Sequence, residues 1–189
     1  MIKNLINKLL NKLTLHYYLK KYNGIWGFKN FLAQNNIQNI RLLEIFDAYF
    51  NRYGAWIGVK SQMAGLPCFP HEFYGIFISG GTIIGKNVVI FQHVTIGSNT
   101  LNDSKNTGCP TIGDNVYIGA GAKIIGKIVI GNNCRIGANA VVYQDMPANS
   151  VAVQAPTQII QKSNLDNRFF GGMNGKLVYY DDGKWIEAK

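Results

Sequence analysis

Histidine is the side chain best suited to moving a proton near neutral pH, and this chain of 189 residues has only three, His16, His71 and His93. An imidazole that takes the proton of a hydroxyl group acts as a general base in group transfer to that hydroxyl. His16 lies among apolar residues at helical spacing, which favours a structural or surface role. His71 and His93 are therefore the candidates for catalysis.

Cysteine and metal chemistry have little support in the sequence. Cys68, Cys109 and Cys134 show no CxxC spacing, so we expect neither a disulfide framework nor a zinc site, and a reducing cytoplasm is the default compartment. No nucleophilic serine or cysteine constellation is visible, and a covalent acyl carrier at Cys109 is disfavoured. We expect an enzyme that needs no metal.

Isoleucine recurs every six residues in two long series, with glycine often directly after it. The first series is Ile78, Ile84, Ile90 and Ile96, and the second is Ile112, Ile118, Ile124, Ile130 and Ile136, closed by Val142. A period of six fits neither a helix nor an alternating strand. It predicts short strands joined by tight corners, stacked so that isoleucine packs on isoleucine in one core. An ordinary β-sandwich is disfavoured, because its strands do not hold so fixed a spacing.

This array resembles the hexapeptide-repeat acetyltransferases, whose six-residue repeats (hexads) wind into left-handed parallel β-helices. Together with the segment from Phe69 to Ile78, it is similar to serine acetyltransferases and to O-acetyltransferases of polysaccharide synthesis. In that family a histidine shortly before a Gly-Ile-x-Ile strand is the catalytic base, which implies this role for His71. The spacing from His71 to Gly75 is one residue longer than in typical serine acetyltransferases, which favours the polysaccharide enzymes.

The resemblance implies acetyl-CoA as co-substrate. Related enzymes contact acetyl-CoA through the third residue of hexads with small residues, which points to Ala120 and Ala138. Gly97 is expected to offer a backbone N–H near the thioester. The stretch after Val142 resembles the family's exit from the β-helix. Further cofactor contacts are expected there and in the tail beyond, at Tyr143, Gln144, Gln158 and Lys162, with Lys162 as the phosphate partner.

The interval from Ile96 to Ile112 is 16 residues, 4 more than two hexads need, so residues 98–110 must bulge out as a loop. In the family such a loop reaches over the active site of a neighbouring subunit. Serine acetyltransferases end it with Arg-His-Pro, where this chain has Gly-Cys-Pro. This difference favours a sugar hydroxyl of a surface polysaccharide or its precursor as acceptor, with free serine as the alternative. Candidate acceptor contacts are Glu72, Asn99, Asp103 and Lys105.

The role of His93 cannot be taken from the resemblance, because related proteins commonly have Gln or Ser there. Its offset within the hexad predicts a coil face or corner, where it could contact the acceptor or assist His71; a plain polar surface role is the alternative. A carboxylate usually orients a histidine base. Glu72 is adjacent to His71 in sequence, and Asp47, Asp103 or a backbone carbonyl are further candidates.

The predicted fold is mainly β, in three parts: an N-terminal helical region (1–53), a left-handed parallel β-helix (54–162) and a C-terminal segment (163–189). In the last part, Ser163–Gly175 is polar and glycine-rich, which predicts a loop. The apolar runs of residues 176–180 and 184–188, on either side of Asp-Asp-Gly, then predict a short β-hairpin.

The first 53 residues are predicted to form two helices, the second over Ile37–Arg52, with Gly24 and Gly27 marking the connection. One face of the first helix carries Ile2, Leu5, Ile6, Leu9, Leu13 and Tyr17. We expect this face to pack within a homotrimer, with higher assembly through these helices as an extension. The alternative is an interfacial membrane helix, given lysines on the other face.

Charge is unevenly placed: the net charge is +9, and residues 1–43 hold seven basic residues and no acid. This bias predicts an anionic partner, and the resemblance favours cofactor phosphates, a glycan or a membrane surface over nucleic acid. No apolar stretch approaches the roughly 20 residues of a spanning helix, and no signal peptide is evident. We expect a cytoplasmic enzyme, with peripheral contact at the inner membrane face as a further hypothesis. A non-catalytic β-helical scaffold is the alternative of another class.

Overall fold

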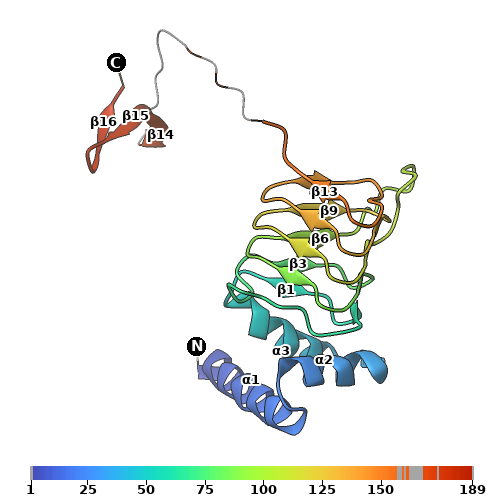
Figure 1. Ribbon diagram of the computed structural model, residues 1–189. Coiled ribbons are helices and arrows are strands. Elements are labelled where there is room, and N and C mark those ends of the chain that lie inside the picture. The colour runs from blue at the N-terminus through green and yellow to red at the C-terminus, as the bar shows by residue number, and fades with distance from the viewer. Residues whose placement is uncertain (1, 157–158, 160, 162–167, 174, 189) are drawn as a thin grey trace. The chain divides into compact units, whose positions relative to one another are not determined.

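The computed structural model describes residues 2–156, 159, 161, 168–173 and 175–188 (Figure 1). The chain divides into a compact unit of residues 1–154 and a second unit of residues 155–189. In the first unit, three helices precede a left-handed parallel β-helix, which confirms the predicted fold class.

The β-helix consists of short parallel strands arranged in three sheets, which we name A, B and C. Sheet A contains β1 (Trp56–Ile57), β3 (Phe77–Ile78), β6 (Thr95–Gly97), β9 (Lys123–Ile125) and β12 (Val141–Val142). Sheet B contains β2 (Gln62–Met63), β4 (Ile83–Ile84), β7 (Thr111–Ile112) and β10 (Val129–Ile130). Sheet C contains β5 (Val89–Ile90), β8 (Tyr117–Ile118), β11 (Arg135–Ile136) and β13 (Val151–Ala152).

The predicted isoleucine ladder forms the core. In sheet A the strand register places Ile57, Ile78, Ile96, Ile124 and Val142 one above another. Every isoleucine of the ladder is at most 1% exposed, and burial of such a side chain contributes about 1.5–3 kcal/mol. The register also extends one coil further toward the N-terminus than the sequence indicated, because β1 and β2 pair with β3 and β4.

Turns join the sheets at three corners. The C–A corner, which leads from sheet C to sheet A, comprises residues 69–76, 91–94, 119–122 and 137–140. The A–B corner includes residues 79–82, the loop of residues 98–110, and residues 126–128 and 143–145. The B–C corner comprises residues 85–88, 113–116, 131–134 and 147–150. The first two corners hold the candidate functional residues.

A ladder of asparagines lines the B–C corner. Asn87, Asn115, Asn133 and Asn149 all have positive φ, between 55° and 61°, a region that asparagine tolerates better than most residues. Their side-chain amides form a chain of hydrogen bonds, each 3.1–3.2 Å long, from one coil to the next. The same residue type therefore turns the backbone and links the coils.

Three helices, α1 (Ile2–Lys21), α2 (Ile25–Gln34) and α3 (Ile40–Asn51), cover the N-terminal end of the β-helix (Figure 1). Two helices were predicted, so the reading of the region around Gly27 as a connection was wrong. Gly27 lies inside α2, and a Cβ there would collide with the carbonyl oxygen of Tyr22. This glycine serves the close approach of α2 to the preceding turn.

Helix α2 places a buried lysine against the first coil. Lys29 is only 3% exposed, and its Nζ donates a hydrogen bond to the carbonyl oxygen of Ser61. Burial lowers the pKa of Lys29 to about 8. The buried site disfavours the charged form of the Lys29 amine. The stability of the packing between α2 and the first coil therefore depends on pH.

The predicted apolar face of α1 is solvent-exposed in the single chain. Leu9, Leu13 and Tyr17 are 60%, 58% and 56% exposed. The opposite side of α1, which includes Leu15 and Leu19, packs against the core. The exposed stripe is thus available to a partner surface, as both predictions for this helix require.

In the unit of residues 155–189, β14 (Phe169–Met173), β15 (Lys176–Asp181) and β16 (Lys184–Glu187) form an antiparallel sheet. The predicted hairpin is confirmed as β15 and β16. A loop was predicted over Ser163–Gly175, and this prediction was wrong for residues 169–173, which form β14. Residues 162–167 and 174 lie outside the described residues. Gly171 lies against the ring of Trp185, so glycine there makes room for an aromatic side chain.

Candidate active site

His71 lies on the long first turn of the C–A corner, which the N-terminal helices hold in place. The ring of Phe69 stacks on that of Trp26 with centroids 5.7 Å apart, and Phe73 packs on Phe50 at 5.2 Å. These two phenylalanines point inward, whereas His71, between them in sequence, is exposed. The helices therefore anchor the turn and leave its imidazole open to solvent.

Two residues of the next coil contact the imidazole of His71. Its Nδ1 lies 2.7 Å from Oε1 of Gln92, within hydrogen-bonding distance. The ring of Phe91 meets it edge to face, with centroids 5.4 Å apart. Sequence analysis missed Gln92, although it directly precedes the candidate His93, because its partner lies 21 residues away.

His93 occupies the same corner one coil above the His71 turn. Its φ of 60° lies in the left-handed region, which is uncommon for a residue other than glycine and is often found at functional sites. Its N–H donates to the carbonyl oxygen of Tyr74, 2.8 Å away. Its ring fills the space over Gly75, where a Cβ would collide with Nδ1. The predicted location on a corner is correct.

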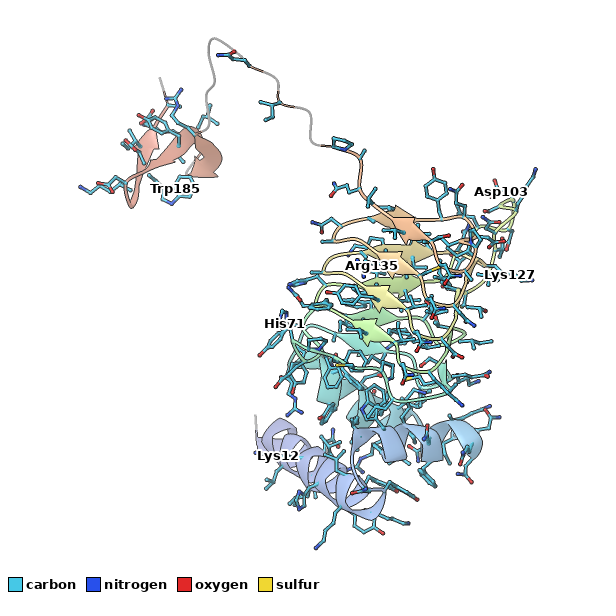
Figure 2. All side chains as sticks on the ribbon, viewed as in Figure 1. Lys12, His71, Asp103, Lys127, Arg135 and Trp185 are labelled. Carbon is cyan, nitrogen blue, oxygen red and sulfur yellow. The ribbon has the colours of Figure 1, made fainter. Side chains whose placement is uncertain are left out.

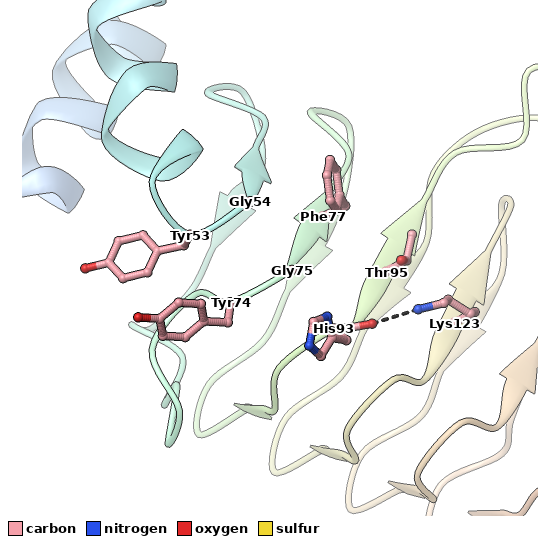
Figure 3. A pocket seen from close by; sticks show the side chains of 8 residues that line it. All are labelled: Tyr53, Gly54, Tyr74, Gly75, Phe77, His93, Thr95 and Lys123. Carbon is pink, nitrogen blue, oxygen red and sulfur yellow. Dashed lines mark hydrogen bonds between the residues drawn. The ribbon is translucent and has the colours of Figure 1, made fainter. Parts of the chain in front are cut away.

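An open hollow of about 570 Å³ lies beside His93 (Figure 3). Its lining includes the aromatic rings of Tyr53, Tyr74 and Phe77, and also Thr95 and Lys123. Tyr74 and Phe77 are 53% and 46% exposed, so their faces are free to contact a ligand. Lys123 is the cation among the lining residues, and none of them is an acid. The hollow suits a small polar ligand with an apolar face.

Ala120 and Ala138, which are predicted to contact acetyl-CoA, lie at the C–A corner, as the two histidines do. Gly121 N–H donates to the carbonyl oxygen of Gln92 at 2.9 Å, and Asn139 N–H donates to that of Ala120 at 2.8 Å. These bonds stack the turns that carry Gln92, Ala120 and Ala138. Along this corner, the exposed imidazole of His71 is followed by the turn of residues 91–94 and then by two turns with small side chains.

The acidic residues weighed as partners of His71 lie near other groups. Glu72 lies near Tyr53, whose pKa is raised by burial and further by this carboxylate. Asp47 lies near Trp56, and burial raises the pKa of Asp47. Figure 2 shows Asp103 on the opposite side of the β-helix from His71. Among the residues that the structure describes, Gln92 is the side chain that contacts a ring nitrogen of His71.

A second group of predicted residues gathers at the A–B corner. The loop of residues 98–110 closes on itself: the backbones of Asn99 and Gly108 exchange two hydrogen bonds of 2.9 Å, and the Asn99 amide bonds Ser104. The amide of Asn106 donates to the carbonyl oxygen of Tyr143, 3.2 Å away. The residues at this corner are Gly97, Asn99, Asp103, Lys105, Tyr143 and Gln144.

The single chain does not bring the two groups together. The A–B corner lies at the other end of the sheet A strands from the C–A corner, which carries His71, and the predicted role of Gly97 near the thioester stays a prediction. Gln158 and Lys162 lie outside the described residues, and their predicted contacts with CoA stay predictions.

Two further findings concern metal ligands and cysteine among the described residues. No group of three or more His, Cys, Asp or Glu side chains within them could hold a metal ion. Cys109 is half-buried, with its sulfur packed over Gly81. Within the same residues, no helix is long and apolar enough to cross a membrane.

Comparison with known proteins agrees with this architecture. Residues 109–144 match the bacterial transferase hexapeptide (six repeats) family. This match lies within the β-helix, from the residues before β7 to the turn after β12. The β-helix and its surroundings are similar to serine acetyltransferases: that of Mycobacterium tuberculosis (strain H37Rv) is 36% identical over 143 residues, which cover 74% of this chain and 60% of the relative. That of Helicobacter pylori (strain J99) is 44% identical over 88 residues, 47% of this chain and 50% of the relative.

Solved structures show the same fold. Serine acetyltransferase isoform 3 of Entamoeba histolytica, in complex with cysteine, superposes with a TM-score of 0.58 at 28% identity over 73% of this chain and 50% of that one. A serine acetyltransferase in complex with CoA gives 0.55 at 29% identity, over 70% and 52%. The chain thus spans about half to three fifths of the length of these relatives.

Proposed function

We propose that the chain is an acetyl-CoA-dependent O-acetyltransferase with His71 as its general base. The observation that carries the proposal is the exposed His71 imidazole at the C–A corner, stacked below the turns of Ala120 and Ala138. The similarity to serine acetyltransferases, one of them solved with CoA, supports the same chemistry. A plain scaffold would have no need of an exposed imidazole in this position.

The proposed reaction is a direct transfer. Nε2 of His71 takes the proton of the acceptor hydroxyl group while the hydroxyl oxygen bonds to the thioester carbon. The tetrahedral oxyanion then collapses, the C–S bond breaks, and the imidazolium returns the proton to the leaving thiolate. The products are an O-acetyl ester and free CoA. A positioned base contributes about 10²–10⁴ to the rate, and one oxyanion donor about 10²–10³.

The acceptor is the open part of the proposal. The names of the relatives support serine, and they give no support to the sugar acceptor that the loop sequence favoured. The sugar stays as a second candidate on one observation: the hollow beside His93 presents the rings of Tyr53, Tyr74 and Phe77, and aromatic faces suit the apolar face of a sugar ring.

We propose a site shared by two chains of a homotrimer. The candidate residues divide between the C–A corner, with His71, His93, Ala120 and Ala138, and the A–B corner, with the loop, Gly97, Tyr143 and Gln144. Two neighbouring β-helices would bring one corner of each kind together. In that arrangement Asn99, Asp103 and Lys105 of one chain would face His71 of the next.

The N-terminal helix carries a further proposal. Its exposed stripe of Leu9, Leu13 and Tyr17 and the lack of acids in residues 1–43 support contact with another trimer or with an anionic membrane surface. A cytoplasmic location is part of the same proposal. Flotation with anionic and neutral vesicles would separate membrane contact from higher assembly.

A thiol-release assay tests the function. Purified full-length protein is incubated with acetyl-CoA and with serine, neutral hexoses, N-acetylhexosamines or sugar acids, and free thiol is followed over time. The proposal expects acceptor-dependent thiol release and a product heavier by one acetyl group in mass spectrometry. Release with serine alone would settle the acceptor against the sugars, and no release with any acceptor would leave the scaffold alternative.

A further inference from the structure

A histidine base needs one ring nitrogen free of hydrogen, and the neighbour of the other nitrogen decides which one that is. In the structure that neighbour is Gln92, whose Oε1 lies 2.7 Å from Nδ1 of His71. An amide oxygen can only accept a hydrogen bond, so the contact requires the proton on Nδ1. Nε2 then carries the lone pair.

Backbone hydrogen bonds hold the main chain at Gln92 in place. The backbone carbonyl oxygen of Gln92 accepts the N–H of Gly121 at 2.9 Å, and the next residue, His93, donates its N–H to the carbonyl oxygen of Tyr74 at 2.8 Å. The corner is therefore tied to the coil above and to the coil below. Phe91, on the other side of Gln92, packs edge-on against the His71 ring. Two consecutive residues of one coil thus hold the imidazole of the coil beneath it.

From this geometry we propose that Gln92 is the positioning residue of His71: it holds the imidazole in the Nδ1–H tautomer and keeps Nε2 available as the base. The inference rests on the proposed function, because it gives His71 the role of base. Within the same chain, Glu72 lies near Tyr53 and Asp47 near Trp56, and the side chain in contact with Nδ1 of His71 is the amide of Gln92. Within one chain, the partner of the ring is therefore neutral, where a carboxylate would be usual.

A neutral partner has a consequence for pH dependence. A carboxylate stabilises the imidazolium form by charge, whereas an amide does so only by accepting a hydrogen bond. Gln92→Glu should therefore keep the tautomer and favour the protonated ring. The acid limb of the kcat/KM profile is expected to move up by about one pH unit, with turnover retained above it.

The decisive test reads the tautomer without using activity. Histidine labelled with ¹⁵N is incorporated into the full chain, and the His71 ring signals are assigned by their loss in His71→Ala. The inference expects the Nδ1–H form in the wild type and in Gln92→Glu, and a shift toward Nε2–H in Gln92→Leu. An Nε2–H tautomer in the wild type would overturn it, whatever the enzyme acts on.

Kinetics supply the second arm. For Gln92→Leu we expect kcat to fall about 10- to 100-fold while KM for the acceptor stays within about twofold, because the base is misaligned and binding is intact. Gln62→Leu, on the exposed side of β2, is the matched control and should behave as wild type. Equal kinetics for the two leucine variants would overturn the positioning role, whereas an inactive wild type would count against the proposed function alone.

Discussion

Nζ of Lys123 donates a hydrogen bond to the carbonyl oxygen of His93, 2.7 Å away, and so ties strand β9 to the corner below it (Figure 3). The N–H of His93 is bonded to Tyr74, and its ring lies over Gly75. A residue in the left-handed region is thereby restrained at both backbone groups and at its ring. Gly121 and Asn139 have a similar positive φ at this corner in the two coils above, so the conformation belongs to the corner, and the role of His93 in ligand binding stays a prediction.

His93→Asn should remove the imidazole while the backbone at this position keeps its conformation. Asn139 takes the corresponding place two coils above with a φ of 57°, so asparagine can adopt the conformation of His93. We expect KM for the acceptor to rise several-fold, kcat to change less, and the melting temperature to stay close to wild type. Steady-state kinetics with the identified acceptor measure this, and unchanged KM would remove His93 from the site.

His93→Ala is the companion variant. Alanine lacks the local hydrogen bonding that lets asparagine tolerate positive φ, so strain of about 1–2 kcal/mol is expected on top of the lost imidazole. Thermal unfolding should show alanine less stable than asparagine at this position. Equal melting temperatures would mean that the corner relaxes and that the left-handed conformation carries no cost.

Asn115 should be the weak point of the asparagine ladder. It bonds Asn87 on one side at 3.1 Å and Asn133 on the other at 3.2 Å, and its φ is 56°. Asn115→Ala removes both bonds and adds backbone strain, so a loss of about 2–3 kcal/mol is expected. Asn115→Gly removes the same bonds without the strain and should lose about 1–2 kcal/mol. Denaturant unfolding measures the free energy of unfolding of both variants. An equal loss for glycine and alanine would contradict the contribution of backbone strain.

Lys29 predicts a pH-dependent stability. Burial lowers its pKa to about 8, while the unfolded chain has the ordinary value of 10.5. Between these two values the unfolded state binds more protons than the folded state. The contribution of Lys29 to the free energy of unfolding therefore grows as pH rises from 8 to 10.5, and it is lost as pH falls through 8. Relative to Lys29→Met, the wild type should gain on the order of 1 kcal/mol across this window. Paired thermal melts from pH 7 to pH 10 test this, and a constant difference would speak against it.

Mixed trimers test the shared site. Chains with His71→Ala keep the loop, and chains lacking residues 100–106 keep His71, so each homotrimer should be inactive. A trimer that contains both chain types always has one interface at which an intact His71 meets an intact loop. One of its three sites is then complete, so mixed trimers should regain about one third of wild-type activity. Co-expression with two affinity tags isolates them. Mixed trimers as inactive as their parents would place the whole site within one chain.

The isoleucine ladder could be predicted because each coil repeats the same local demand, an inward residue followed by a corner. His71 and His93 could be placed near corners for the same reason. The pairing of His71 with Gln92 could not, because 21 residues separate them and the long turn at residues 69–76 breaks the hexad count. The asparagine ladder was hidden in the same way, since its steps of 28, 18 and 16 residues are unequal.

Helix α2 and strand β14 were missed for another reason. In both, glycine was taken as a sign of irregular structure, whereas Gly27 and Gly171 make room for a backbone carbonyl and for an indole ring. Such close approaches depend on partners that the local sequence does not reveal. The division of the candidate site between two corners could likewise be seen only once the coils were stacked.

The most direct test of the whole account is acceptor-dependent thiol release from acetyl-CoA by the wild type and by His71→Ala, prepared side by side. The account predicts that kcat falls at least about a hundredfold in the variant while its melting temperature and oligomeric state stay unchanged. Near-wild-type turnover by a folded His71→Ala protein would contradict it.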